Sequence, residues 1–256
     1  MARGEGRGGT VVMLHDVLRE GEPLDGSGFT GAGPDRYKIR LPLFEALVAR
    51  ARAAGTTLTF DDGGRSALDV VLPVLEDHGV RGEFHVATAR LGTPGFLDRS
   101  GVAEIAARGH VVGTHSHTHP ARMPALTHPE VLAEWRTSIA ILADATGRPV
   151  THGSVPNGFV SRSVVAAAAE AGIRTLYTSS PTRRRRTWGD MEVVGRFAVL
   201  AVDSPAQALG LAGDEPGARL RQTARWRALA LPKRVLGHRY DGVRTRILES
   251  VARRST

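Results

Sequence analysis

TLTFDDGG, residues 57–64, joins a short apolar strand to two adjacent carboxylates and two glycines. Residues 57–60 predict a buried β-strand, and residues 66–78, in which apolar side chains recur at helical spacing, predict a helix that ends near Gly79. A strand followed by a helix is the building unit of a parallel sheet. The stretch therefore predicts one β/α unit, with both carboxylates at the carboxyl end of its strand.

Further β/α units flank this one on both sides. Parallel strands joined by helices need right-handed crossovers, and about seven such units in 256 residues suit a closed or nearly closed barrel better than an open sheet. The sequence therefore predicts an α/β fold, a distorted (β/α)7-type barrel in a single domain. The other predicted strands are residues 10–15, 83–87, 110–114, 150–152, 175–178 and 193–200, and the other predicted helices are residues 41–54, 102–107, 129–145 and 160–171.

Both ends of the chain are expected to lie outside the barrel wall. Residues 1–9 have no apolar run, which predicts a disordered leader and no signal peptide. The catalytic domain then covers residues 10–256, and its Arg- and Leu-rich segment 216–254 predicts helices packed on the barrel exterior. No apolar run approaches the roughly 20 residues of a membrane span, so we expect a cytoplasmic protein.

The composition excludes several kinds of site. The chain has no cysteine, which excludes disulfides, thiolate metal ligands, iron–sulfur clusters and a cysteine nucleophile. Its 34 lysines and arginines against 26 aspartates and glutamates give a net charge of +8. A basic surface attracts phosphates, nucleic acid or anionic glycans, but it also keeps a protein soluble. Aromatic residues are only 5 % of the chain and no nucleic-acid motif is present, so we expect no nucleic-acid partner.

Three predicted strands end in reactive side chains, and barrel enzymes carry their sites at such strand ends. Because side chains alternate along a strand, one of Asp61 and Asp62 can bind a cation while the other faces bound water. Residues 115–119 (HSHTH) hold three histidines, two of which can direct imidazole nitrogens to one ion. His15 ends the first strand beside Asp16 and can transfer a proton at the same rim. The alternatives are a helix-capping turn for the aspartates, a solvated loop for the histidine cluster and a structural His15.

One Asp and two His form a site best suited to Zn²⁺, with Co²⁺, Ni²⁺, Mn²⁺ or Fe²⁺ as other possibilities. Together, these residues resemble the polysaccharide deacetylase family (the NodB homology domain, carbohydrate esterase family four). Residues 59–63 (TFDDG) match its first motif, and residues 115–119 match its second motif, in which two histidines flank a Ser or Thr and two free positions. The spacing of the two motifs and the lead-in at residues 109–113 also fit, and the resemblance covers residues 15–178.

The resemblance implies a role for each of these residues. By similarity Asp62, His115 and His119 are the metal ligands and Asp61 is the catalytic base. The third motif is usually Arg-x-Pro-x-Gly, where the arginine pairs with the base. Residues 154–158 (SVPNG) keep the Pro and the Gly but have a serine in place of that arginine, which puts the orientation and pKa of the base in question.

The predicted substrate contacts lie in this loop and in the place of the fourth motif. Pro156, Asn157 and Gly158 are the contacts in the loop. The fourth motif has no clear counterpart, and residues 183–188 (RRRRTW) occupy its place. Trp188 is the predicted stacking surface for a sugar ring, with filling of a gap as the alternative, and the arginines either meet the phosphates of an anionic substrate or form a solvated loop.

Two histidines are candidates for the general acid of the fifth motif. His238 belongs to a Leu-Gly-His near the end of the chain, in a segment that reads as helical. His15 lies ahead of the two aspartates, as in relatives that deacetylate poly-N-acetylglucosamine and carry the motifs in a circularly permuted order. The strand-end position favours His15, so the chain resembles this permuted subgroup most.

The resemblance implies hydrolysis of the N-acetyl group of an amino sugar to an amine and acetate, with a divalent metal as cofactor. With no export signal, we expect a glycoside, a nucleotide sugar or a lipid-linked precursor as substrate rather than crystalline chitin. A second reading keeps the fold and the metal but has a non-sugar or cyclic amide as substrate. A third, a non-catalytic basic module that binds nucleic acid or anionic glycan, predicts steeply salt-dependent binding and no bound metal.

Overall fold

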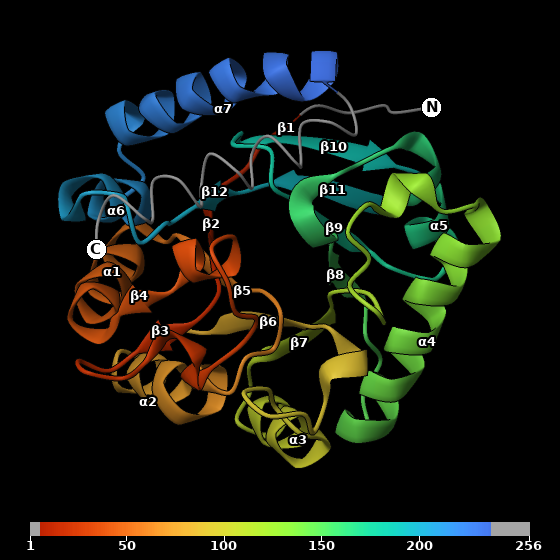
Figure 1. Cartoon of the computed structure of the whole chain (residues 1–256), viewed down its shortest axis with the longest axis horizontal. Coiled ribbons are helices and arrows are strands. Elements are labelled where there is room, and N and C mark those ends of the chain that lie inside the picture. The colour runs from red at the N-terminus through yellow and green to blue at the C-terminus, as the bar shows by residue number, and fades with distance from the viewer. Residues whose placement is uncertain (1–5, 237–256) are drawn as a thin grey trace.

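Parallel strands curl into the wall of a barrel, and helices pack around its outside (Figure 1). The computed structural model describes residues 6–236 of the chain. The described strands are β1 (Gly6–Arg7), β2 (Val11–Leu14), β3 (Val17–Leu18), β4 (Ile39–Arg40), β5 (Thr57–Phe60), β6 (Gly82–Val86), β7 (Val111–Thr114), β8 (His152–Ser154), β9 (Thr175–Thr178), β10 (Arg184–Trp188), β11 (Met191–Gly195) and β12 (Phe197–Ala198). The described helices are α1 (Leu41–Ala54), α2 (Leu72–Asp77), α3 (Arg99–Ala107), α4 (His128–Thr146), α5 (Arg162–Glu170), α6 (Pro205–Ala212) and α7 (Pro216–Leu236).

The segment from β11 to β12 joins the two ends of the parallel sheet. The sheet runs in the order β2, β5, β6, β7, β8 and β9, with every neighbouring pair parallel. β11 pairs with β9, and after a single residue, Arg196, β12 pairs with β2 at the other end. The wall is therefore closed by one bent segment, and Arg196 sits at the bend.

Apolar side chains fill the space between the wall and the helices. In the larger cluster, α1 buries Phe44 against Phe60 of β5, which stacks on Phe84 of β6; the ring centroids lie 5.9 and 4.9 Å apart. In the second cluster, Trp135 of α4 is fully buried among side chains of α5 and β9. This packing fixes the strands whose carboxyl ends carry the polar motifs.

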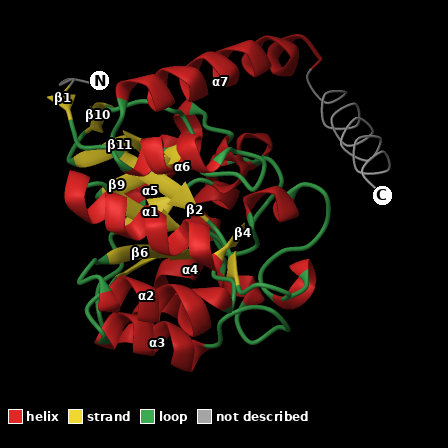
Figure 2. Cartoon of the chain, turned by 90° about the vertical axis from the view of Figure 1, so that its left-hand side faces the viewer, coloured by secondary structure: helices red, strands yellow, loops and turns green. Residues whose placement is uncertain are grey.

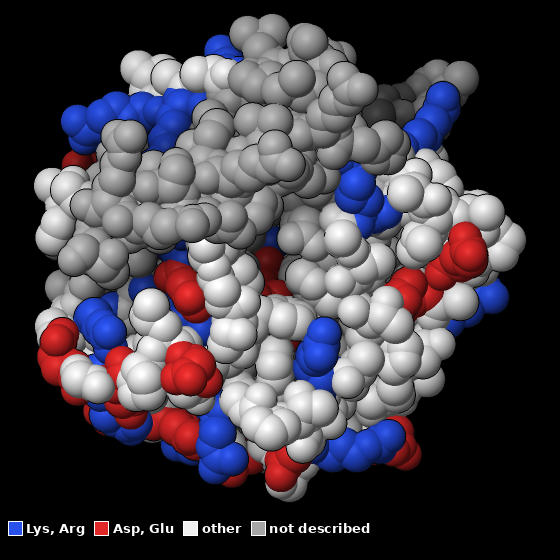
Figure 3. Space-filling model, viewed as in Figure 1, with Lys and Arg blue, Asp and Glu red and all other residues white. Residues whose placement is uncertain are grey.

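Charges of both signs are interspersed on the face seen in Figure 3, and acidic side chains lie in a hollow near its centre. Several arginines are held by acidic partners within the fold: Arg183 pairs with Asp214 at 3.1 Å and Arg185 with Glu192 at 2.8 Å. Within the described part of the chain, these two arginines therefore lie beside counter-charges. None of the described helices is long and apolar enough to cross a membrane.

The structure confirms the predicted single-domain barrel, and most predicted strands and helices match within a few residues. Three details differ. Residues 6–7 of the expected disordered leader form β1, whose backbone pairs with the edge of β10; residues 1–5 lie outside the described residues. The arginine run forms β10 instead of a loop, because its backbone pairs with β11 in a hairpin. The predicted strand 193–200 is divided at Arg196, where its pairing passes from β9 to β2.

The C-terminal segment contains helices, as the sequence predicts. α6 packs on α1, and α7 extends along the top of the barrel in Figure 2. Ala218 of α7 is buried, whereas Leu220 and Trp226 are exposed, so α7 contacts the domain through its first turns. The predicted helical segment beyond Leu236 lies outside the described residues.

Candidate metal centre and active site

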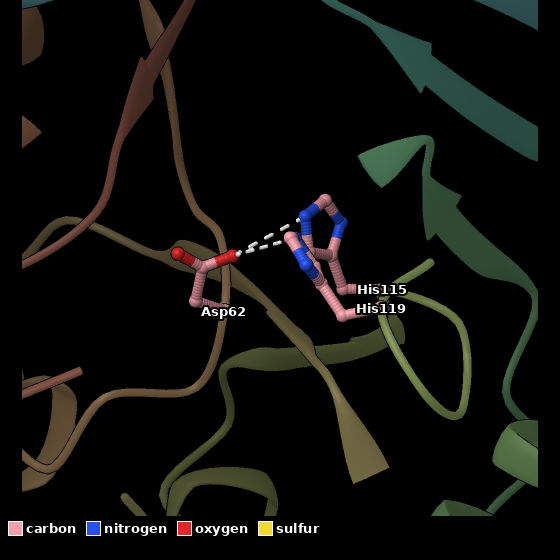
Figure 4. A group of neighbouring side chains, drawn as sticks. All are labelled: Asp62, His115 and His119. Carbon is pink, nitrogen blue, oxygen red and sulfur yellow. Dashed lines mark ion pairs between the residues drawn. The ribbon is translucent and has the colours of Figure 1, made fainter. Parts of the chain in front are cut away.

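Asp62, His115 and His119 point toward one another at the barrel rim (Figure 4). One ligand atom from each side chain lies within 4.8 Å of the others. The Oδ1 atom of Asp62 is 3.3 Å from Nε2 of His115 and 3.4 Å from Nε2 of His119. Among the described residues this is the single cluster of three potential metal ligands that meets these distances. The two sequence motifs, 53 residues apart at Asp62 and His115, thus converge on one point.

Unusual backbone conformations aim these ligands. Asp62 and His119 both have positive φ, +80° and +57°, as does Ser116 at +66°. Such values are uncommon for residues with a side chain and persist where the surrounding structure enforces them. Gly63 follows with φ of +80°, and a Cβ atom there would lie 2.9 Å from the side chain of Val86. The glycine after the two aspartates is therefore required by the turn that directs Asp62 into the cluster.

The loop of the three histidines is held by α4. The carboxylate of Glu134 accepts hydrogen bonds from the backbone N–H groups of His117 and Thr118, at 2.9 and 2.8 Å, and from the Thr118 hydroxyl at 2.7 Å. Nδ1 of His117 lies 2.9 Å from the hydroxyl of Thr88. His117 therefore contacts Thr88 and not the cluster, so the two histidines that face Asp62 are His115 and His119.

The cluster has the features expected of a divalent-metal site. Oδ1 of Asp62 is buried and has no hydrogen-bond donor of good geometry among the described residues, which leaves a lone pair for a cation. Burial alone would raise the pKa of Asp62, but the facing imidazoles of His115 and His119 outweigh it and lower that pKa far below its usual range. Nδ1 of His115 lies 3.1 Å from the Ser154 carbonyl oxygen, a contact that directs Nε2 toward the cluster. A carboxylate with two imidazoles is a donor set that suits Zn²⁺ and similar cations.

Asp61 is buried beside this cluster and is paired with Arg196. The guanidinium donates from two nitrogens, to Oδ1 at 2.7 Å and to Oδ2 at 2.6 Å. Oδ1 also accepts from the Ser154 hydroxyl at 3.1 Å and lies 3.2 Å from Nδ1 of His85. Burial would raise the pKa of Asp61, but Arg196 and His115 hold it well below the usual range. Asp61 is therefore an anion in the folded protein.

Arg196 and His85 are site residues that the sequence analysis did not identify. Both side chains are fully buried and contact Asp61. A sequence signal for Arg196 exists, because a single arginine interrupts the apolar run VVGRFAVL, residues 193–200, and a buried charge needs a partner. His85 carries no comparable signal, since one histidine in a short strand is common.

His15 lies at the same rim, as the sequence predicts. It is close enough to interact electrostatically with Asp61, Asp62 and His115, and its ring packs on Tyr37 with centroids 4.3 Å apart. Burial lowers the pKa of His15 despite these carboxylates, and its Nδ1 atom has no hydrogen-bond partner among the described residues. His15 is thus a partly buried imidazole beside the cluster, and its buried Nδ1 atom is free of hydrogen bonds within the described residues.

Asp16 anchors a loop instead of facing the cluster. Its Oδ1 accepts hydrogen bonds from the hydroxyls of Ser27 and Ser66, at 2.5 and 2.8 Å, and burial raises its pKa. The anchored loop places Phe29 against His119, with ring centroids 4.7 Å apart. The sequence analysis did not predict this contact of Phe29, because the loop residues show no periodic pattern.

The predicted substrate contacts are divided between two places. Pro156, Asn157 and Gly158 follow β8 at the rim, and Nδ2 of Asn157 lies 3.5 Å from the carbonyl oxygen of Pro120 in the histidine loop. Trp188 does not lie with them. It pairs with Met191, the first residue of β11, at the opposite end of that strand from Arg196, and packs in the second apolar cluster. His238, the other candidate acid, lies outside the described residues.

An Asp–His–His cluster at the rim of a β/α barrel is typical of metal-dependent hydrolases. Within that class, residues 50–176 match the family model described as polysaccharide deacetylase. This segment, just under half of the chain, is therefore similar to the polysaccharide deacetylase family.

Individual relatives agree with this similarity. The chain is 33 % identical over 150 residues to a chitooligosaccharide deacetylase of Bradyrhizobium sp. (strain ANU 289), an alignment that covers 56 % of this chain and 65 % of the relative. It thus spans just under two thirds of that relative's length. The solved structure of the Streptococcus pyogenes deacetylase PplD in complex with acetate has a TM-score of 0.65 at 16 % identity, covering 80 % of this chain and 97 % of that chain.

The structure of IcaB from Ammonifex degensii is equally similar, with a TM-score of 0.65 at 20 % identity and coverage of 81 % of this chain and 98 % of that chain. At these identities the likeness to both solved structures shows a shared fold. The family match begins at residue 50 and ends at residue 176, so it contains both metal-site motifs but neither His15 nor Arg196.

Proposed function

We propose that this protein is a metal-dependent deacetylase that hydrolyses the N-acetyl group of an N-acetylated amino sugar to an amine and acetate. The observation that carries the proposal is the convergence of Asp62, His115 and His119 next to a second buried carboxylate, Asp61. Hydrolysis of an amide needs an activated water and a base, and this pair of groups offers a cation site and a base side by side. The family match and the chitooligosaccharide deacetylase relative also support the amide bond of the N-acetyl group as the one that is hydrolysed.

We further propose that the cation is Zn²⁺, held by Oδ1 of Asp62 and Nε2 of both histidines. A divalent cation there would polarise the acetamide carbonyl and acidify water. The donor set supports this choice, because borderline-soft Zn²⁺ favours imidazole with a carboxylate at three-ligand catalytic sites. Co²⁺, Ni²⁺, Mn²⁺ and Fe²⁺ are compatible with the same ligands.

The protein's own groups have distinct tasks in this reaction. Asp61, anionic because of its pairing with Arg196, accepts the proton of the attacking water. His15 delivers a proton to the departing amine, which is otherwise a poor leaving group. Because burial lowers the pKa of His15, it must take up a proton before it donates one. The rings of Phe29 and Tyr37 pack against those of His119 and His15 and restrict their movement.

The position of His15 supports a motif order like that of circularly permuted poly-N-acetylglucosamine deacetylases. In this proposal the acid comes from the end of β2, ahead of the aspartates in the chain, and not from His238. We therefore propose glycans or glycosides of N-acetylglucosamine as the substrate class. The printed name of the relative from Bradyrhizobium, a chitooligosaccharide deacetylase, supports acetylated sugar oligomers within that class.

The proposal is tested by acetate release from a panel of N-acetylglucosamine oligomers, with a hydantoin-like cyclic amide measured in parallel. We expect Zn²⁺-dependent acetate release from a sugar and none after chelation. Asp61→Asn should keep full metal stoichiometry and lose turnover, whereas His119→Ala should lose metal first.

His117→Ala is the matched control, because this histidine shares the loop but contacts Thr88 instead of the cluster. It should keep both metal and activity. If the enzyme hydrolyses the cyclic amide but none of the sugars, the proposed substrate class is wrong. If Asp61→Asn keeps near-wild-type activity, Asp61 is not the base.

A further inference from the structure

We propose that Arg196 is the positioning residue of the Asp61 base. The proposal rests on the proposed function, because it assigns a role within that reaction. Its structural basis is the two-pronged ion pair between the guanidinium and the carboxylate, at 2.7 and 2.6 Å. Both side chains are almost fully excluded from solvent, with exposed fractions of 0 % and 2 %.

The guanidinium is itself fixed on every side. Besides Asp61, its Nη1 donates to the Thr59 hydroxyl at 3.0 Å and its Nε to the Thr178 carbonyl at 3.4 Å. Its Cζ atom lies 5.5 Å from the ring centroid of Tyr177. Thr59 and Thr178 belong to β5 and β9, so opposite parts of the wall hold the arginine in one orientation.

This arrangement determines which way the carboxylate faces. A planar fork of donors matches the plane of a carboxylate, and a pair held in this way has little rotational freedom. Ser154 and His85 add contacts to Oδ1, at 3.1 and 3.2 Å, but each contributes a single contact to a single oxygen. Arg196 therefore dominates the orientation of Asp61, and it does so from the bend between β11 and β12, not from the loop after β8.

The first experiment separates charge from geometry. Arg196→Lys keeps the positive charge but loses the fork of donors, so we expect kcat to fall on the order of 10²-fold, the size of effect that a small misplacement of a catalytic group produces. KM for the N-acetylglucosamine oligomer and Zn²⁺ stoichiometry should stay at wild-type values. Arg196→Met removes the charge as well and should lower kcat further.

The matched control is Arg185→Met, which also removes an arginine from an ion pair, here with Glu192 at 2.8 Å on the outer hairpin. It should leave kcat unchanged. An Arg196→Lys enzyme with wild-type kcat would overturn the proposal, as would a fall in kcat that follows loss of bound Zn²⁺, since that pattern belongs to a structural role.

A second experiment tests the pair without using activity. Removing one member of a buried ion pair leaves the other charge uncompensated, so Arg196→Met should lower the thermal unfolding midpoint markedly. Asp61→Asn in the same chain should recover most of that loss. If wild-type protein releases no acetate but this recovery is seen, the proposed function fails and the pairing stands. If the enzyme is active and no recovery occurs, the assignment of Arg196 is wrong while the function stands.

Discussion

Ser154 occupies the point where the base and the metal ligands meet. Its hydroxyl lies 2.5 Å from Nδ1 of His115 and 3.1 Å from Oδ1 of Asp61. The backbone carbonyl of the same residue also lies 3.1 Å from that Nδ1 atom. The serine found here in place of the third-motif arginine therefore links the two halves of the site.

Ser154→Ala should weaken Zn²⁺ binding only mildly. Loss of an outer partner of a metal-bound histidine commonly costs 10- to 100-fold in affinity, and here the carbonyl remains as a second partner, so we expect about 10-fold or less. Competition with a zinc chelator measures the change. A loss beyond about 100-fold would mean that the hydroxyl, and not the carbonyl, orients His115.

At the scale of single residues, the sequence predicts what local spacing encodes. Asp62, His115 and His119 belong to short motifs, and the structure brings them together as predicted. Arg196 could not be placed in the same way, because its partner is distant in the chain and lies across the barrel. The end of the barrel at which Trp188 lies could not be predicted for a related reason. The chain reverses direction between β9 and β10, and strand alternation alone does not show this reversal.

Among the secondary-structure elements, α4 has a direct connection to the metal site. Glu134, on the second turn of that helix, accepts three hydrogen bonds from residues 117–118. The loop backbone is strained at Ser116 and His119, so it needs such support to stay in place.

Glu134→Ala should therefore lower Zn²⁺ affinity, because the loop can relax and carry His119 out of the cluster. Isothermal titration with Zn²⁺ measures the effect. Thr127→Ala is the control on the same helix: it removes the N-cap of α4 and should cost about 1 kcal/mol of stability with unchanged affinity. Equal affinities for the wild type and Glu134→Ala would show that the loop is held by other contacts.

The N-terminus of α3 gives a pH-dependent prediction. Asp98 caps this helix, and hydrogen bonds from the Ser100 hydroxyl and the Gly101 backbone, at 2.7 and 2.8 Å, lower its pKa. Because the pKa of Asp98 is lower in the folded than in the unfolded protein, its contribution to stability is fully present at pH values above the unfolded pKa of about 3.9. It is then lost as the pH falls through the lower, folded value.

Asp98→Ala should accordingly be less stable than wild type at neutral pH, and the difference should shrink on acidification. Urea unfolding of both proteins at a series of pH values measures it. Asp190→Ala serves as comparison, because Asp190 forms an exposed ion pair with Arg174 at 3.3 Å and caps no helix. Such a pair contributes little, so a pH trend as large as that of Asp98→Ala would contradict the assignment of the cap.

Element prediction succeeded where apolar periodicity is strong and failed where backbone pairing decides. α1 begins and ends where the sequence predicts, at Leu41 and Ala54, since its apolar face and the Gly55 C-cap are both local signals. The strand β8 begins at His152, later than predicted, because three residues carry little periodicity. β10 has a sequence of charged residues that no strand pattern describes, and its pairing with β11 and β1 alone makes it a strand.

For the molecule as a whole, the metal site should be linked to stability. The cluster gathers ligands from the ends of two strands and buries a carboxylate oxygen that accepts no hydrogen bond of good geometry within the described residues, so a cation that binds only the folded state stabilises it. At a Zn²⁺ concentration of about 100 times Kd, the expected gain is about 2.7 kcal/mol. Thermal unfolding with and without Zn²⁺ should show this shift for wild type and His117→Ala but not for His119→Ala. A shift of equal size in all three would place the bound ion elsewhere.

Arg196 also links the order of synthesis to the completion of the site. A ribosome releases Asp61 long before it releases the arginine that balances it, and a carboxylate enclosed without a cation is strongly unfavourable. During synthesis, the barrel should therefore stay open between β2 and β9 until β11, Arg196 and β12 have been made. A product terminated ahead of residue 196 would retain the zinc-binding side chains but would lack the segment that closes its barrel. The base would therefore be correctly paired only once the whole barrel has been synthesised.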